Sequence, residues 1–205
     1  MTIIGIDDTD SRTKGMCTTY VGHKISEDLQ EHGETVSRVL LVRLNPAAKH
    51  KTRGNAAIAV HTDADSEIAF EIAKDNLEKY AVTDDDMTNP GMVIAESVPD
   101  MLPEYTERVM HELIEISEAE GIIEDHDELQ AYYQGNGRGR IGSLAAIGSW
   151  DAFTDWTVET ISYRAEQNWG TERQVDESSV VSAANKYHPK VWDTIDRTNG
   201  DTVCV

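Results

Sequence analysis

Apolar residues in the N-terminal half of the chain follow two different spacings, which predict helices and strands in a definite order. In two segments an apolar residue recurs about every four positions, as on the buried face of an amphipathic helix. Between these segments lie short runs rich in Val, Ile and Leu that are bounded by Gly, Pro or charged residues, which is typical of strands. The predicted strands cover residues 3–6, 35–44, 56–61 and 92–96, and the predicted helices cover 17–29 and 66–80.

These elements have the order β-α-β-β-α-β, which is the split βαβ or ferredoxin-like pattern. The sequence therefore predicts an α+β fold for the N-terminal part. A third helix is expected over 103–118, with Val109, Leu113 and Ile116 on its inner face and Pro103 in its first turn.

The C-terminal part of the chain is less regular. A strongly acidic stretch that ends near Leu129 predicts a domain boundary, so we expect domains over residues 1–129 and 130–205. In the second domain we expect strands over 141–147 and 157–164, and helical or turn-like segments over 178–187 and 191–196. An apolar, β-branched tail follows Asn199-Gly200, where a strand would begin. The second α+β domain is therefore predicted to be truncated at its C-terminal end.

Acidic residues are spread along the whole chain. There are 38 Asp and Glu residues against 18 Lys and Arg, which gives a formal net charge of -20. Because 39% of the residues are hydrophobic and form periodic segments, a disordered acidic tail is excluded. Such a charge is typical of proteins from salt-loving microbes, where salt screens the repulsion; an ordinary acidic protein is the alternative. In this background only local groups of cations are informative about nucleic-acid binding.

The two cysteines, Cys17 and Cys204, are too few for a structural zinc site, which needs about four ligands. They also do not suggest a disulfide framework. No apolar stretch approaches the roughly 20 residues of a membrane span, and no signal peptide opens the chain. The sequence therefore predicts a soluble, cytoplasmic protein without a membrane partner.

An acidic loop, residues 7–11, directly follows the first predicted strand. Asp7, Asp8 and Asp10 would repel one another unless a cation lies among them, and Mg²⁺ prefers a few carboxylates together with substrate phosphates. The sequence therefore predicts a magnesium site, with a solvated turn as the alternative. An aspartate-based phosphatase also begins with an apolar strand and an Asp-x-Asp pair, but Arg12 stands where that class has Thr or Val.

The first predicted helix begins next to two hydroxyl side chains. Gly15 and the backbone N–H groups at this helix start are suited to receive a phosphate, and Thr18 or Thr19 is a candidate to accept one. On the residues alone, however, a helix N-cap is the favoured role for these threonines.

A glycine–arginine segment, residues 135–142, is the second candidate site. Its glycines let the backbone approach a polyanion, and its arginines offer a fork of donors suited to phosphate. The residues predicted to bind ATP or phosphate are Gly135, Gly137, Arg138, Gly139 and Arg140. A flexible linker is the alternative interpretation.

A basic loop, residues 46–55, is a weaker candidate. Lys49, Lys51 and Arg53 are predicted to contact RNA, although a hairpin loop that happens to be basic is nearly as good an interpretation. Trp169 beside Arg173 is a still weaker stacking candidate. The histidines are scattered, and none is assigned a role.

Taken together, five motifs resemble those of the archaeal tRNA(Ile) 2-agmatinylcytidine synthetases, in the same order along essentially the whole chain. They are G-I-D-D-T-D-S at 5–11, G-M-C-T-T-Y at 15–20, R-L-N-P at 43–46, K-T-R-G-N-A-A at 51–57 and G-N-G-R-G-R-I-G at 135–142.

This resemblance implies an ATP-dependent ligase that acts on the tRNA(Ile) with a CAU anticodon. Such an enzyme phosphorylates the ring carbonyl of the wobble cytidine, and agmatine then displaces the phosphate. The resemblance further implies that residues 1–129 form a kinase-like domain that binds ATP and Mg²⁺ through Asp7, Asp8 and Asp10, and that Thr18 is autophosphorylated. The second domain is then expected to be ferredoxin-like.

Full-length members of that family also carry an oligonucleotide-binding fold and a zinc ribbon, which are not found in this sequence. The chain resembles their N-terminal part, so we expect it to keep the nucleotide site and to bind tRNA weakly. Two rival functions remain open. One is a non-catalytic RNA-binding module in which the aspartates are dispensable, and the other is an aspartate-based phosphatase.

Overall fold

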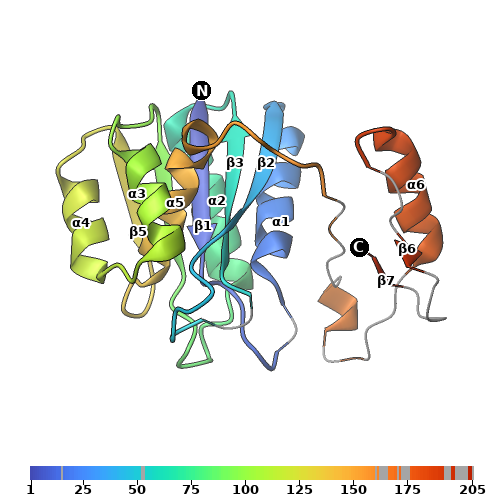
Figure 1. Cartoon of the computed structure of the whole chain (residues 1–205), viewed down its shortest axis with the longest axis horizontal. Helices are drawn as coiled ribbons and strands as arrows, with labels where there is room; N and C mark the ends of the chain where they lie inside the picture. Colours follow the sequence, from blue (N-terminus) through green and yellow to red (C-terminus); the bar gives the residue numbers. More distant parts are fainter. Residues whose placement is uncertain are drawn as a thin grey trace. The chain divides into compact units, whose positions relative to one another are not determined.

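Strand β1, Thr2–Asp7, lies at the centre of a five-stranded antiparallel sheet (Figure 1). The other strands are β2 (Val36–Arg43), β3 (Ala56–Thr62), β4 (Gly91–Ala95) and β5 (Leu129–Tyr133), and the order in the sheet is β2-β3-β1-β4-β5. Because β1 pairs on both sides and both of its faces are covered, Ile3, Ile4 and Ile6 are buried. This is why β1 reads as a continuous apolar run rather than as an alternation.

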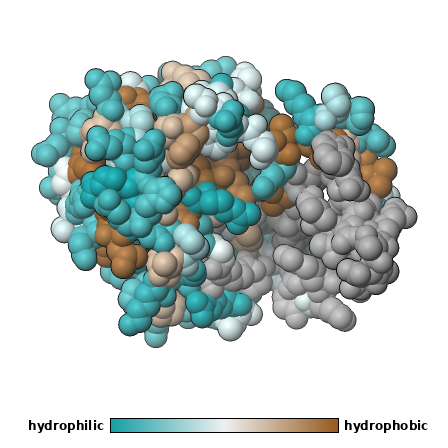
Figure 2. Space-filling model, in the orientation of Figure 1, coloured by the Kyte–Doolittle hydropathy of each residue, from teal (hydrophilic) through white to brown (hydrophobic). Residues whose placement is uncertain are grey.

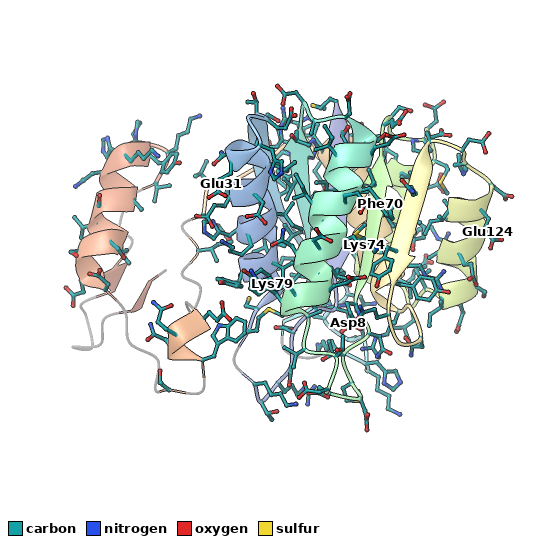
Figure 3. The ribbon with its side chains drawn as sticks, turned by 180° about the vertical axis from the view of Figure 1, so that it is seen from behind. Asp8, Glu31, Phe70, Lys74, Lys79 and Glu124 are labelled. Atoms are coloured by element: carbon teal, nitrogen blue, oxygen red, sulfur yellow. The ribbon has the colours of Figure 1, made fainter. Side chains whose placement is uncertain are left out.

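Helices cover both faces of the sheet (Figures 1 and 3). Helices α1 (Thr18–Glu31) and α2 (Ser66–Tyr80) lie on one face, and α3 (Leu102–His111), α4 (Ile116–Glu124) and α5 (Gly139–Ala152) lie on the other. The regular spacing of Val21, Ile25 and Leu29 places all three in the core, as predicted. Gly33 follows the helix with a φ of 91°, a left-handed conformation that suits a glycine after a helix end.

The computed structural model describes the whole chain except residues 15, 52–53, 160, 162–165, 170, 172–175, 192–194, 197–202 and 205. The packing divides the chain into two compact units, Met1–Phe153 and Thr154–Val205. The predicted division at residues 129 and 130 coincides with the start of β5, which pairs with β4 inside the first unit. The functional division of the chain at that point stays a prediction.

The predicted α+β class is confirmed, and the first six elements occur in the predicted order. The single helix expected over 103–118 is wrong, because α3 ends at His111 and α4 begins at Ile116. Leu113, which was expected to face inward, lies between the two helices and is 72% exposed. Strand β5 was not predicted, since its residues follow directly on the acidic stretch that was interpreted as a boundary.

The strand expected over 141–147 is also wrong, because these residues form the middle of α5. Residues 142–149 are buried without interruption, so the helix has no polar face. A helix that is apolar all round shows no period of 3.6 residues, and its sequence is then easily mistaken for a buried strand.

The second unit contains the 3₁₀ helix η1 (Glu166–Asn168), helix α6 (Glu177–Tyr187), and the paired strands β6 (Ile195–Asp196) and β7 (Val203–Cys204). The helix expected over 178–187 is confirmed, and Asp176 caps it by accepting from the N–H groups of Ser178 and Ser179. Ile195–Asp196 is a strand rather than helical or turn-like.

The strand expected over 157–164 lies partly outside the described residues. Residues 157–159 and 161, which are described, belong to no strand. No helix among the residues that the structure describes is long and apolar enough to cross a membrane. On the face shown in Figure 2, hydrophilic residues cover most of the first unit, in keeping with the acidic composition.

Candidate active site at the carboxyl end of strand β1

The antiparallel pairing of β1 with β4, and of β4 with β5, brings three connections to one end of the sheet. Asp7 at the end of β1 pairs with Gly91 at the start of β4, and Gly91 pairs with Tyr133 at the end of β5. The acidic loop, the segment between α2 and β4, and the glycine–arginine segment therefore meet here. Figure 3 shows Asp8 at this end, beside the connecting loops.

Two helices also begin at this end of the sheet. Helix α1 starts at Thr18, whose Oγ1 accepts a hydrogen bond from Thr9 Oγ1 at 3.0 Å. Helix α5 starts at Gly139 and packs so closely on β1 that a Cβ added to Gly142 would lie 2.1 Å from Asp7 Oδ2. Helix N-termini carry a partial positive charge, which favours an anionic ligand at this place, although the first N–H groups of α5 already donate within the protein.

Asp8 contacts both of the other segments that meet at this end of the sheet. Its Oδ2 accepts from Arg138 Nη2 at 2.7 Å and from the Asn89 backbone N–H at 3.1 Å, and its side chain is 8% exposed. Burial raises the pKa of Asp8 to about 6, although Arg138 and these hydrogen bonds act in the opposite direction. Asp8 also has a φ of 56°, a left-handed conformation that non-glycine residues rarely adopt and that often marks a functional site.

Asp7 lies beside Asp8 in a similarly unfavourable place for a charge. Burial raises the pKa of Asp7 well above its ordinary value, and the neighbouring charge of Asp8 raises it further. A divalent cation at these two carboxylates would reverse both effects. The acidic loop therefore has an electrostatic reason to bind Mg²⁺.

Asp10 is buried, and its backbone carbonyl accepts from Thr88 Oγ1 at 2.8 Å. Among the described residues, no group of three or more His, Cys, Asp or Glu side chains is arranged to hold a metal ion. Asp7, Asp8 and Asp10 thus do not form a complete protein cage for a metal. One or two of them fit the usual Mg²⁺ arrangement, in which substrate phosphates supply further ligands.

Thr18 is the first residue of α1, and Cys17 occupies the N-cap position without a capping side-chain hydrogen bond. The capping role favoured for Thr18 on the residues alone is therefore wrong. Thr18 is buried, and its hydroxyl accepts a hydrogen bond from Thr9 of the acidic loop. This contact joins Thr18 to the acidic loop through Thr9, and the role of Thr18 as a phosphate acceptor stays a prediction.

The glycine–arginine segment is an ordered turn followed by the start of α5, rather than a linker. Gly135 and Gly137 have positive φ angles of 63° and 72°, which the turn requires. Arg138 Nη2 donates to Asp8 Oδ2 and also to the Met87 carbonyl at 2.6 Å. It is the arginine of this segment that contacts the acidic loop.

Arg140 has different partners. It is buried, donates from Nη1 to Glu120 Oε1 at 3.1 Å and from Nε to the Gly137 carbonyl at 3.2 Å, and stacks 3.8 Å from the centre of the Tyr133 ring. These contacts tie the turn to α4 and β5. They direct the Arg140 guanidinium to Glu120 rather than to the aspartates, so a direct phosphate contact from Arg140 stays a prediction.

The basic loop lies next to the acidic loop. Arg12 Nη2 donates to the Lys51 carbonyl at 3.0 Å, which joins the two loops. Lys49 is exposed and Lys51 is half-buried, whereas Arg53 lies outside the described residues. This contact joins the predicted RNA-binding loop to the residue that directly follows the acidic loop, and RNA binding by the basic loop stays a prediction.

The segment between α2 and β4 was missed by the sequence analysis as part of the site. Val82 N–H donates to the Thr9 carbonyl at 2.9 Å, and Ser11 donates to Asp85. Thr88 and Asn89, both buried, contact Asp10 and Asp8. The only signal in the sequence is Pro90-Gly91, which directly follows this pair where β4 begins.

Fold and site together define an α+β protein with carboxylates, an arginine and two helix N-termini at one end of its sheet, which is a set of groups of the kind that suits phosphate. Family models agree with this class. Those described as TiaS TCKD domain match residues 3–64 and 61–135, and one described as TiaS FLD domain matches residues 137–205. The chain belongs to the TiaS family, and the predicted resemblance is confirmed.

Curated relatives carry the name 2-agmatinylcytidine synthetase TiaS, with an isoleucine tRNA as the named substrate. The protein of Haloquadratum walsbyi is 49% identical over 212 residues, which cover 100% of this chain and 45% of the relative. The protein of Methanosarcina mazei is 40% identical, over 99% of this chain and 49% of the relative. The chain thus spans about half the length of the curated relatives it matches, in their N-terminal half.

Solved structures of TiaS are also similar to this chain, over about half of their own length. A complex of TiaS with its isoleucine tRNA and ATP is 33% identical with a TM-score of 0.77, and the match covers 100% of this chain and 49% of that one. Apo TiaS is 32% identical with a TM-score of 0.80, over 100% of this chain and 48% of that one. A TiaS complex with the same tRNA, AMPCPP and agmatine is 32% identical with a TM-score of 0.76, over 100% and 49% of the two chains.

Proposed function

We propose that the chain takes part in 2-agmatinylcytidine synthesis, in which ATP is used to phosphorylate the wobble cytidine of the tRNA(Ile) with a CAU anticodon and agmatine is then conjugated to it. The observation that carries the proposal is the contact of Asp8 with Arg138, together with the hydrogen bond from Thr9 of the acidic loop to Thr18 at the start of α1. Relatives named for this synthesis, and TiaS complexes with tRNA, ATP and agmatine, support it.

The chemistry explains why such an enzyme needs a phosphoryl donor. The carbonyl oxygen of cytidine is a poor leaving group until it carries a phosphoryl group. The amine of agmatine then forms the new C–N bond, the C–O bond breaks, and inorganic phosphate leaves. In this scheme ATP supplies the phosphoryl group, and Arg138 together with the N-termini of α1 and α5 would stabilise its negative charge.

Mg²⁺ is the proposed metal, with Asp7 and Asp8 as its first candidate ligands and Asp10 as a third. When bound, it would neutralise phosphate oxygens of ATP. The support is the raised pKa of two adjacent, partly buried carboxylates, which ionise more easily beside a cation.

Thr18 is proposed to accept a phosphoryl group. In that step the bond between Thr18 Oγ1 and the γ-phosphorus of ATP forms, the bond from that phosphorus to the bridging oxygen breaks, and ADP leaves. The hydroxyl proton would pass to a carboxylate of the acidic loop. The hydrogen bond from Thr9 holds the Thr18 oxygen in place.

We further propose that residues 1–129 supply the kinase-like ATP and Mg²⁺ region and that residues 130–205 supply Arg138 and a second α+β region. The β-α-β-β-α-β order with strands in the order β2-β3-β1-β4 supports a ferredoxin-like origin for the first region. A cytoplasmic location would follow from a tRNA substrate.

Mass spectrometry after incubation with ATP and Mg²⁺ tests the proposal. We expect a phosphate on Thr18 in the unaltered chain and none in Thr18→Ala, whereas the neighbouring Thr19→Ala keeps it. Asp8→Asn should weaken ATP binding at least about tenfold, because a carboxylate that binds the metal is lost. An unmodified Thr18, together with unchanged ATP binding by Asp8→Asn, would show that the site is wrongly assigned.

A second assay separates the enzyme from a non-catalytic RNA-binding module. Agmatine incorporation into tRNA(Ile) is compared for the 205-residue chain and for a longer chain of the relatives' full length. We expect incorporation by the longer chain to depend on Asp7 and Asp8. If neutralising both aspartates leaves incorporation intact, these carboxylates are not part of the active centre.

A further inference from the structure

Thr88 and Asn89 lie buried between the acidic loop and the glycine–arginine segment, although neither belongs to the motifs recognised in the sequence. They are 5% and 8% exposed. Buried polar side chains in this position must satisfy their hydrogen bonds within the protein. Their hydrogen-bond partners are residues of the acidic loop and of the glycine–arginine segment.

Asn89 makes three hydrogen bonds that join these segments. Its backbone N–H donates to Asp8 Oδ2 at 3.1 Å, its Oδ1 accepts from the Asn136 N–H at 3.0 Å, and its carbonyl accepts from the Gly139 N–H at 2.9 Å. The side chain thus holds the turn before α5, while the backbone holds both Asp8 and the first N–H of α5. Thr88 adds the bond to the Asp10 carbonyl.

The turn also packs closely on Asn89. A Cβ added to Gly135 would lie 2.5 Å from Asn89 Oδ1, and one added to Gly139 would lie 2.9 Å from the Asn89 carbonyl. Arg138, which contacts Asp8, lies between these two glycines in the sequence. The position of its guanidinium therefore depends on how firmly the turn is held against Asn89.

We propose that Asn89 is a positioning residue, which holds the glycine–arginine turn on the acidic loop so that Arg138 faces Asp8 and both face the phosphates of ATP. Its role toward ATP rests on the proposed function. Its role in holding the turn does not, because these hydrogen bonds join protein groups only. Thr88 fixes the other side of the acidic loop in the same way.

Hydrogen exchange and ATP binding of the whole 205-residue chain test the proposal in Asn89→Ala. Without ligand, the amides of Asn136 and of the turn should exchange about tenfold faster, because the acceptor of the Asn136 N–H is lost. The dissociation constant for ATP with Mg²⁺, measured by calorimetry, should rise about tenfold for the same reason. Unchanged exchange at residues 135–140 would overturn the proposal whether or not the chain binds ATP.

Asn76→Ala is the matched control, since Asn76 is also a buried asparagine and bonds to Asp28 and Ile72 far from the turn along the chain. It should lose stability but keep the ATP affinity and the exchange rates of the turn. If it weakens ATP binding as much as Asn89→Ala does, Asn89 acts only through stability. If the unaltered chain fails to bind ATP, the proposed function fails, and the exchange measurement still decides the role of Asn89.

Three further variants separate the hydrogen bonds of Asn89 and Thr88 from the bulk of their side chains. Asn89→Asp retains the acceptor for the Asn136 N–H, so exchange of the turn should stay slow while the added charge weakens ATP binding.

Thr88→Val removes the hydroxyl that holds Asp10, whereas Thr88→Ser keeps it. We expect weaker ATP binding for Thr88→Val and recovery for Thr88→Ser; equal affinities in the two would contradict a positioning role for Thr88.

Discussion

At the scale of single residues, burial opposes ionisation of the Asp8 side chain, and a bound cation would favour it. Its folded-state pKa is about 6, against an ordinary value of 3.8. Folding therefore favours the protonated carboxyl. The stability that this group contributes is present below about pH 4 and is lost as the pH rises through about 6.

Asp8→Asn should accordingly make the metal-free protein more stable at pH 7. A shift of this size corresponds to roughly 1–3 kcal/mol in the free energy of unfolding. The gain should disappear between pH 6 and pH 4, where the carboxyl of the unaltered protein becomes protonated. Urea unfolding in EDTA across this pH range measures it.

The exposed Asp125→Asn provides the comparison, because it removes a carboxylate outside the site. It should leave the slope of stability against pH between 4 and 6 nearly unchanged. Added Mg²⁺ should stabilise the unaltered protein and Asp125→Asn more than Asp8→Asn. Equal stabilisation of all three proteins would exclude Asp8 as a metal ligand.

At the scale of elements, two neighbouring helices contain glycines in opposite surroundings. In α5, a Cβ on Gly148 would lie 2.4 Å from the Leu102 carbonyl and 2.7 Å from Thr106 Oγ1. In α4, a Cβ on Gly121 would meet nothing within 4 Å. Gly148 thus permits close packing of α5 on α3, whereas Gly121 only weakens its own helix.

Gly121→Ala should therefore raise the free energy of unfolding by about 0.5–1 kcal/mol, the ordinary gain in helix propensity. Gly148→Ala makes the same chemical change, yet it should lower stability by about 1–3 kcal/mol, because the α3 backbone cannot move away cheaply. Chemical unfolding of both variants checks the pair. Similar stabilisation by both would mean that α5 does not pack on α3 as described.

At the scale of the whole molecule, the net charge of -20 opposes compaction unless salt screens it. Part of this repulsion is visible on α2. Glu67, Glu71 and Asp75 are exposed and follow one another at intervals of four residues. Like charges at this spacing are neighbours on a helix surface and destabilise it.

The melting temperature should rise steeply as KCl is increased from low concentration to about 1 M, where the screening length falls to about 3 Å. A triple variant, Glu67→Gln, Glu71→Gln and Asp75→Asn, should melt higher at low salt and gain less from added salt. Thermal melts of both proteins across the series test this. A salt response that is unchanged in the variant would show that α2 does not contribute to the repulsion.

The sequence by itself determined the α+β class, four strands and two helices of the first unit, and the acidic loop after β1. These features depend on the spacing of neighbouring residues, and that spacing is visible in the chain. It also contained the ordered motifs from which the family resemblance was inferred. Helix α5 could not be predicted in this way, because a helix buried on every side has no polar face that would reveal its period.

Only the tertiary structure decided which residues meet. Arg138 and Arg140 look equivalent in the sequence, yet the turn places Arg138 on Asp8 and Arg140 on Glu120. No sequence motif includes Asn89. It reaches the site because antiparallel pairing of β4 with β1 and β5 brings together segments far apart in the chain. Such long-range pairing leaves no local pattern, so its consequences for the site appear only in the folded protein.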